Sequence, residues 1–440
     1  MASILQQSPS RVRNLFEKLG LWVLGACYFL WPYHDAPTFL LAGKILISAL
    51  FLFWLFTERP ARPKLSDPAL VLLFIGAAGF TLWAYVSSFW SLAPWRTFKH
   101  VTEEVLLNLM AFGLAAIWAA KASPPALERM KKVVLASFLW VLFLYAFFYV
   151  WWLVKGTPLW PVEEAPKGAV DPISLLFLLP DWHDVLLNRQ NLANYLLFPS
   201  SMALAYLICA RDRRQLLQSL FWFSLFFGVL FLTSKRSALL GLMIGGVIAV
   251  ILAKRFRLFL FLLALMMGLV SLVVFTPLKR YFVRENFRLF LEGKRSQWFQ
   301  AGSIPMRYYG LPYFLRYIRE HPWKGIGYGR FNIKLNPETR ALVKEAHLAH
   351  AHNVWINLAL HLGIPGLVFF LIFLAGEFLC FWRLFKRAGP GHWLALGFLI
   401  YFIAFWVRHQ FDDSFRYATS ALYFLNTGLG VGLSFRKTEP

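Results

Sequence analysis

Long apolar segments alternate along this 440-residue chain with short connections that carry charged residues or prolines. Most of these segments have about 17–25 residues, the length that crosses a bilayer as an α-helix. A transmembrane barrel would show alternating strands of about ten residues instead, and that alternation is absent from the sequence. The pattern predicts an all-α integral membrane protein with twelve spans. Their expected bounds are 19–33, 37–56, 69–91, 101–120, 132–153, 191–210, 215–233, 237–253, 256–276, 353–382, 392–409 and 415–435.

The spans predict three parts of the chain. Residues 1–276 contain the first nine transmembrane helices, and residues 353–440 contain the last three. Between them, residues 277–352 form a long basic loop in which short helices are expected.

Composition agrees with a membrane protein. Hydrophobic residues make up 59% of the chain and charged residues 15%, whereas soluble domains have about 45–50% and 25%. The three cysteines, Cys27, Cys209 and Cys380, lie far apart within or at the ends of apolar segments. They are expected to be small core residues, because neither a disulfide framework nor a metal motif is present.

The distribution of basic residues predicts the orientation. With twelve spans, 21 Lys and Arg residues of the termini and short connections fall on one side of the membrane. The positive-inside rule makes that side cytoplasmic, so both termini are expected in the cytoplasm and the 277–352 loop in the periplasm. The net charge of +23 then favours anionic lipid over nucleic acid as a partner.

Four of the ten histidines lie in the segment EAHLAHAHNVWINLALHLGIPG, residues 345–366. Their HxxHxH spacing is not the HExxH of zinc enzymes, so no metal is expected there. His352 lies between apolar residues and a cation-rich loop, which disfavours its charged form. A neutral imidazole can accept a proton from a hydroxyl group. Alternatively, these histidines are merely solvated or hydrogen-bonded; His347 and His350 are expected at an entrance, and His361 in a structural position.

Several cations are candidate anion-binding groups on the same side. Lys235 and Arg236 connect two predicted spans, and Arg189 lies at the start of another; either phosphate binding or anchoring at the membrane interface would explain them. Residues 311–320 predict an amphipathic helix that ends at His321 and Pro322. The glycines that follow, Gly325, Gly327 and Gly329, expose N–H groups to an anion or simply form a turn.

Three motifs in this order resemble the O-antigen ligase and O-antigen polymerase superfamily. HNVWINLALHLGIPG resembles its histidine motif, and TSKRSALLG is similar to its T-x-S-R element. MRYYGLPYFLRYIREHPWKGIGYGRF resembles its arginine segment, with Arg307 fourteen residues before His321 of the HPxxGxG turn. The chain departs from the family's pattern at Lys235, where Ser is usual, and at His361, where an acidic residue is common.

The resemblance implies a metal-independent glycosyltransferase of type C fold without a cofactor, in the inner membrane, with its active site on the periplasmic face. His352, Arg236 and Arg307 are the expected catalytic residues. The donor is expected to be an undecaprenyl-diphosphate-linked glycan and the acceptor lipid A-core. The residues expected to bind the diphosphate or the acceptor are Arg189, Lys235, Lys324, Arg330 and Asn353. Asp412 or Asp413 is a candidate helper carboxylate.

Two alternatives to an O-antigen ligase remain open at this point. A polymerase would extend the lipid-linked glycan with the same motifs. A transporter of anionic polyprenyl lipids would suit twelve spans and buried cations, although no internal repeat or pair of broken helices is apparent.

Overall fold

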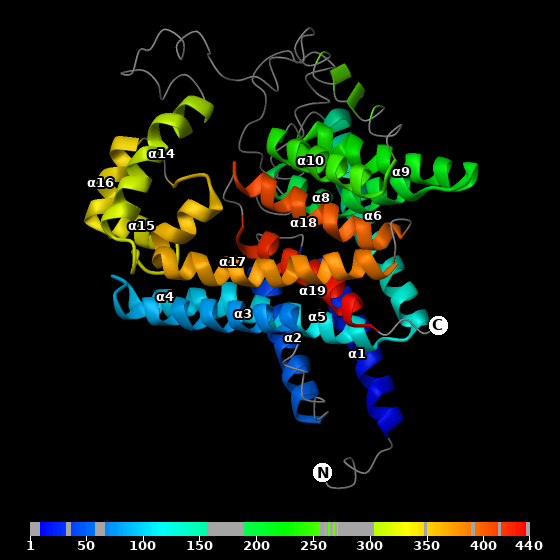
Figure 1. Cartoon of the computed structure of the whole chain (residues 1–440), viewed down its shortest axis with the longest axis horizontal. Helices are drawn as coiled ribbons and strands as arrows, with labels where there is room; N and C mark the ends of the chain where they lie inside the picture. Colours follow the sequence, from blue (N-terminus) through cyan, green and yellow to red (C-terminus); the bar gives the residue numbers. More distant parts are fainter. Residues whose placement is uncertain are drawn as a thin grey trace.

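The computed structural model describes residues 9–31, 37–57, 67–155, 189–233, 235–255, 303–346, 350–388, 392–411 and 415–436, with a few positions between 260 and 271. These residues form helices and turns and contain no strand. The all-α prediction is therefore confirmed for this part of the chain (Figure 1).

Eleven of the twelve predicted segments coincide with helices, and most of the twelfth, 256–276, lies outside the described residues. The helices of the first part are α1 (Pro9–Leu30), α2 (Pro37–Thr57), α3 (Pro68–Val86), η1 (Ser87–Phe89), α4 (Pro94–Val101), η2 (Thr102–Leu106), α5 (Leu107–Lys121), α6 (Pro124–Lys155), α8 (Arg189–Cys209), α9 (Arg213–Leu232) and α10 (Arg236–Leu252). The loop contributes α14 (Ser303–Glu320), α15 (Phe331–Leu335) and α16 (Pro337–Ala346), and α17 (Val354–Ala388), α18 (Trp393–His409) and α19 (Tyr417–Phe435) follow.

Six segments of the described chain are long and apolar enough to cross a membrane. They are Pro68–Phe89, Pro94–Lys121, Pro124–Phe147, Gln190–Cys209, Arg213–Leu232 and Val354–Ala388. Three shorter apolar helices, Leu40–Trp54, Arg236–Leu252 and Trp393–His409, accompany them. The chain is thus a multi-pass helical membrane protein, and the number of twelve spans remains a prediction.

Local sequence explains where many helices begin. Six of the helices named above have proline as their first residue, where its fixed φ and missing N–H cost nothing. The Asp67 side chain accepts a hydrogen bond from the Ala69 amide at the start of α3, and Asp212 caps α9 through the Gln215 amide. Such caps satisfy N–H groups that have no partner within the helix.

Glycines let three pairs of helices approach closely. A Cβ on Gly76 of α3 would lie 2.3 Å from the Phe373 amide nitrogen of α17, and one on Gly432 of α19 would lie 2.1 Å from the Ala116 oxygen of α5. A Cβ on Gly241 of α10 would likewise lie 2.3 Å from the Ala404 oxygen of α18. Small residues at helix contacts are typical of membrane bundles, in which close packing rather than water exclusion holds helices together.

The three cysteines are free and buried, as expected.

The structure departs from the sequence prediction in α17, which was predicted as one span over 353–382. This helix is broken at Gly363, whose φ of 67° and ψ of −176° are not helical. Figure 1 shows α14, α15 and α16 gathered at the end of the bundle where α17 begins, away from the C-terminus.

Candidate functional site

The HPxxGxG turn docks onto the break in α17. The Ile326 and Gly327 amides donate hydrogen bonds to the carbonyls of Leu360 and His361, at 3.0 and 2.9 Å. In return, the Ile364 amide donates to the Pro322 carbonyl at 2.7 Å. The break frees these backbone groups from the helix, and the turn satisfies them. The arginine and histidine motifs, predicted separately from sequence, thus form one structural unit.

Two glycines make this docking possible. Gly325 has φ of 64°, and a Cβ there would lie 2.6 Å from the His361 carbonyl carbon and oxygen. A Cβ on Gly363 would lie equally close to the backbone of Trp323. Both positions combine a positive φ with backbone contact, so glycine alone fits without strain.

The break in α17 is also bonded to the neighbouring helix α3, and the glycine segment to the residues that follow α3. The Trp83 indole donates to the Leu362 carbonyl at 2.7 Å, and the Tyr328 amide donates to the Ser87 hydroxyl at 3.1 Å. The N–H groups of Ile326, Gly327 and Tyr328 are therefore used within the protein. Of the two alternatives that the sequence left open for this segment, these bonds agree with a turn that positions the loop.

His352 lies immediately before α17, in a backbone conformation with φ of 49°. Positive φ is uncommon outside glycine and occurs often at functional sites. Its ring lies 4.0 Å from that of His350, centroid to centroid, and its side chain is half-buried. His361, in contrast, is buried, with Nδ1 3.3 Å from the Gly327 carbonyl oxygen, which agrees with a structural position.

Asn353 fixes the backbone at the start of α17, next to His352. Its Oδ1 accepts hydrogen bonds from the Trp355 and Ile356 amides, at 3.0 and 3.1 Å, as an N-cap does. Its Nδ2 donates to the Gln410 carbonyl at 3.0 Å, which links the start of α17 to the end of α18. Asn353 thus orients the backbone next to His352, while its predicted contact with substrate stays a prediction.

The starts of four helices meet at the end of α18. Arg408 Nη2 donates to the Gln190 carbonyl at the start of α8, and Thr419 of α19 bonds to the Asn191 side chain. The antiparallel contact of Gly241 with Ala404 places the start of α10 there as well. Asn353 bonds to the same region, so the starts of α8, α10, α17 and α19 lie together at the end of the bundle that contains His352. Four helix N-termini carry partial positive charge there, which favours an anion.

The cations predicted to bind anions differ in position and exposure at this end of the bundle. Lys235 and Arg236 form the start of α10, with Lys235 half-buried and Arg236 exposed. Arg189 is the first residue of α8, and Arg307 lies in the first half of α14. The side chains of these two arginines lie outside the described part of the chain, as do His347, Asp412 and Asp413.

Arg330 lines a cavity of about 130 Å³ beside the start of α17. The turn also presents Lys324, which is exposed and whose carbonyl accepts a hydrogen bond from the Trp90 indole at 3.0 Å. The charged and polar residues that line the cavity are Arg96, His100, Glu104, Tyr328, Arg330, Asn357, His361 and Arg416.

The sequence did not single out Glu104, which also lines this cavity. Its two carboxylate oxygens lie 3.5 Å from His100 Nδ1 and 3.3 Å from the Tyr328 hydroxyl. It belongs to η2, a π-helical turn, and such turns are frequent at functional sites. An ionisable residue inside an apolar span was the signal that could have identified it.

The predicted amphipathic helix before the turn is confirmed. Phe314 and Tyr317 of α14 are buried in a small core with Ile326 and Ile333, while Arg316 and Arg319 are exposed. Burial, together with the negative charge of Glu338, raises the pKa of Tyr317 to about 12. Its phenol therefore remains neutral and serves packing against the His321 ring, whose centroid lies 4.5 Å away.

Residues 220–371 match the family model described as O-Antigen ligase. The match covers about a third of the chain and includes Arg236, Arg307, the glycine turn, His352 and the break at Gly363. No curated protein matches the chain significantly. The matched residues include those that form the docked turn and the start of α17, and the match supports membership of the O-antigen ligase and polymerase superfamily.

Proposed function

We propose that this protein is an O-antigen ligase, which transfers a polysaccharide from undecaprenyl diphosphate to a sugar hydroxyl of lipid A-core. The observation that carries the proposal is the docking of the glycine turn onto the break in α17, the helix that begins two residues after His352. It joins the family's motifs at the end of the bundle where four helices start.

The diphosphate of the donor binds among these cations and helix N-termini. The planar guanidinium groups of Arg236 and Arg307 each donate two hydrogen bonds to its oxygens, assisted by Arg189 and Lys235. Positive groups fixed before the reaction stabilise the negative charge that develops on the leaving diphosphate. No metal ion is then needed for this electrostatic work.

His352 acts as the general base. Its neutral imidazole takes the proton of the acceptor hydroxyl while the hydroxyl oxygen attacks the anomeric carbon. The bond from that carbon to the diphosphate oxygen breaks, and the diphosphate leaves with the electron pair. Attack from the face opposite the leaving group inverts the configuration at the anomeric carbon.

A basic loop surface favours lipid A-core as the acceptor. Residues 277–352 contain fourteen Lys and Arg against five Glu, and lipid A-core carries several phosphates. Lys324 and Arg330 present their charges on the docked turn and bind these acceptor phosphates. Raising the salt concentration weakens such contacts between exposed charges, so acceptor binding is expected to fall with salt.

The test uses the full chain purified in detergent, with the undecaprenyl-linked glycan, core-truncated lipopolysaccharide and EDTA. Wild type, His352→Ala and Arg236→Lys are compared on gels, and Arg214→Lys at the start of α9 is the matched control. Arg214 is exposed at the opposite end of the bundle. Loss of one positioned group is expected to cost about 10²–10³ in rate, and the control to retain full rate.

Each other product contradicts a different part of the proposal. A longer glycan that stays on the polyprenyl carrier would identify a polymerase, and no covalent product would favour a transporter. Full activity of Arg236→Lys would reassign Arg236 to membrane anchoring, because lysine keeps the positive charge but cannot form the paired hydrogen bonds of a guanidinium group.

A further inference from the structure

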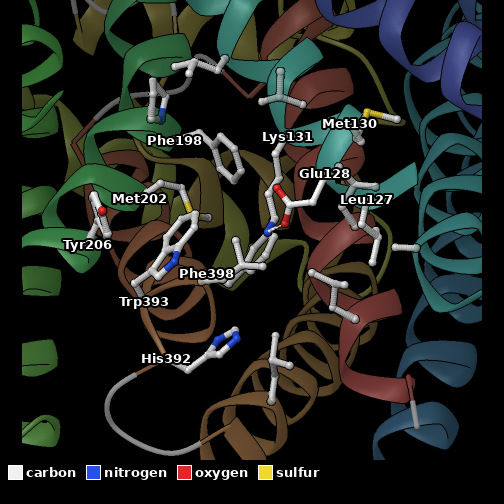
Figure 2. Close-up of a pocket in the computed structure, with 18 of the residues that line it drawn as sticks. Leu127, Glu128, Met130, Lys131, Phe198, Met202, Tyr206, His392, Trp393 and Phe398 are labelled. Carbon is white, nitrogen blue, oxygen red and sulfur yellow. Dashed lines mark hydrogen bonds and ion pairs between the residues drawn. The ribbon is translucent and has the colours of Figure 1, made fainter. Parts of the chain in front are cut away.

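A second and larger cavity lies at the other end of the bundle. It has a volume of about 890 Å³ and lies between α6, α8, α9, α18 and α19, with the last turn of α17 at its edge (Figure 2). Small-molecule sites span about 300–1,000 Å³, so this one can hold a large ligand. The last turn of α17 is the end opposite His352, so the cavity is separate from the candidate catalytic site.

The wall of this cavity is apolar and aromatic. Phe198 and Met202 of α8 line it together with Trp393 and Phe398 of α18 (Figure 2). The Phe198 and Phe398 rings lie 5.9 Å apart, centroid to centroid, and Phe138 of α6 also lines the cavity. From Glu128 to Phe138 the cavity follows α6 for ten residues, about 15 Å at 1.5 Å per residue. This is about half of the ~30 Å apolar core of a bilayer, the depth of one leaflet.

The rim of the cavity is basic. Lys131, Arg387 and Arg436 line it with one acidic residue, Glu128, whose carboxylate pairs with Lys131 at 2.5 Å. Arg387 Nη1 donates to the Ser434 carbonyl at 2.9 Å, which fixes this guanidinium between α17 and α19. Three cations against one carboxylate leave a positive rim above an apolar wall.

His392 adds a neutral donor to the rim. Its Nδ1 accepts a hydrogen bond from the Ala395 amide at 3.3 Å and so caps α18. Partial burial and the charge of Lys131 lower its pKa, so the ring is uncharged and carries its proton on Nε2. That N–H can donate to an oxygen of a ligand at the rim.

We infer that this cavity binds an anionic phospholipid of the bilayer, with its acyl chains among the aromatic residues and its phosphate at the basic rim. The depth of one leaflet suits acyl chains, whereas an undecaprenyl chain is far longer. Charge complementarity selects an anionic head group over a zwitterionic one. The inference concerns the end of the bundle away from His352 and holds whichever glycan reaction occurs there.

The test counts the lipids that remain bound to the full chain in native mass spectrometry after exchange into phosphatidylglycerol or phosphatidylethanolamine. Leu135→Trp fills the cavity from α6, and Leu217→Trp places the same bulk on α9 outside it, where Leu217 is 58% exposed. The charge variant combines Arg387→Gln with Arg436→Gln. Its control combines Lys386→Gln with Lys132→Gln, two exposed cations that do not line the cavity.

Wild type is expected to retain one phosphatidylglycerol that Leu135→Trp loses and Leu217→Trp keeps. The charge variant is expected to lose roughly 10- to 30-fold in retention, since each cation near the membrane surface contributes a factor of about five; its control is unchanged. Equal retention in both tryptophan variants, or equal retention of the two lipids by wild type, would overturn the inference. So would displacement of the retained phosphatidylglycerol from wild type by an equimolar amount of undecaprenyl phosphate.

Discussion

Gly363→Ala tests whether the docked turn organises the site. Gly363 has φ of 67° and ψ of −176°, a region that only glycine adopts readily, and another residue there costs about 1–3 kcal/mol. The added Cβ would also lie 2.6 Å from the Trp323 carbonyl carbon and oxygen. Backbone cannot rotate away as a side chain can, so the turn must move.

Movement of the turn has a further energetic cost. It breaks the 2.7 Å hydrogen bond from the Ile364 amide to the Pro322 carbonyl, which contributes about 1 kcal/mol. The sum is about 2–4 kcal/mol of lost stability. Because Lys324 lies in this turn and Arg330 directly after it, and both are proposed to bind substrate, glycan transfer is expected to fall more than stability does.

Two assays measure these effects. Thermal unfolding in detergent, monitored by tryptophan fluorescence, gives the loss of stability. The transfer assay, run at a temperature where the variant is folded, gives the loss of activity. We expect the unfolding midpoint to fall by about 5 °C or more, at ~2–4 °C for each kcal/mol, and transfer to fall at least tenfold. Gly228→Ala is the matched control, because nothing lies within 4 Å of a Cβ there. If Gly363→Ala behaved like Gly228→Ala in both assays, the turn would not be locked as described.

Three further changes test contacts around the site and at the other end of α17. Asn332→Leu removes an amide of α15 that is 1% exposed and that bonds to Ser91 and to Thr97 of α4; it should cost about 1–3 kcal/mol in thermal unfolding. Trp83→Phe removes the donor to the Leu362 carbonyl and should lower the midpoint while leaving the gel product unchanged in length. Asp67→Asn breaks two 2.6 Å bonds from Arg383 and should cost about 1–3 kcal/mol at neutral pH. Because hydrogen bonds from Arg383 hold the pKa of Asp67 below its ordinary value of 3.8, this stabilisation is complete above about pH 4 and is lost as the pH falls through the lowered pKa. Wild type and Asp67→Asn should therefore converge in stability below that pH, and a constant difference would contradict the pairing.

The positions of the helices could be predicted because a bilayer imposes one strong rule. Backbone polar groups in hydrocarbon must bond within their own segment, so an apolar run of about 20 residues has little choice but a helix. Eleven predicted segments follow this rule. The rule fails at Gly363, where the polar groups freed by the break find partners in the turn at 322–327. Pro365, two residues later, was the local signal of that break.

The roles of individual amides and side chains depended on partners far away in the sequence. The sequence left open whether the N–H groups of the glycine turn meet an anion, and in the structure the carbonyls of Leu360 and His361 accept two of them. Glu104 was missed for the same reason, since its partner Tyr328 lies 224 residues away. Composition could predict that cations gather at the end with His352. It could not predict that a carboxylate lies among them, where it lowers the positive potential that an anionic donor would meet beside Arg330. Glu104→Gln should therefore strengthen donor binding if the diphosphate reaches this cavity, and leave it unchanged if the diphosphate stays at Arg236.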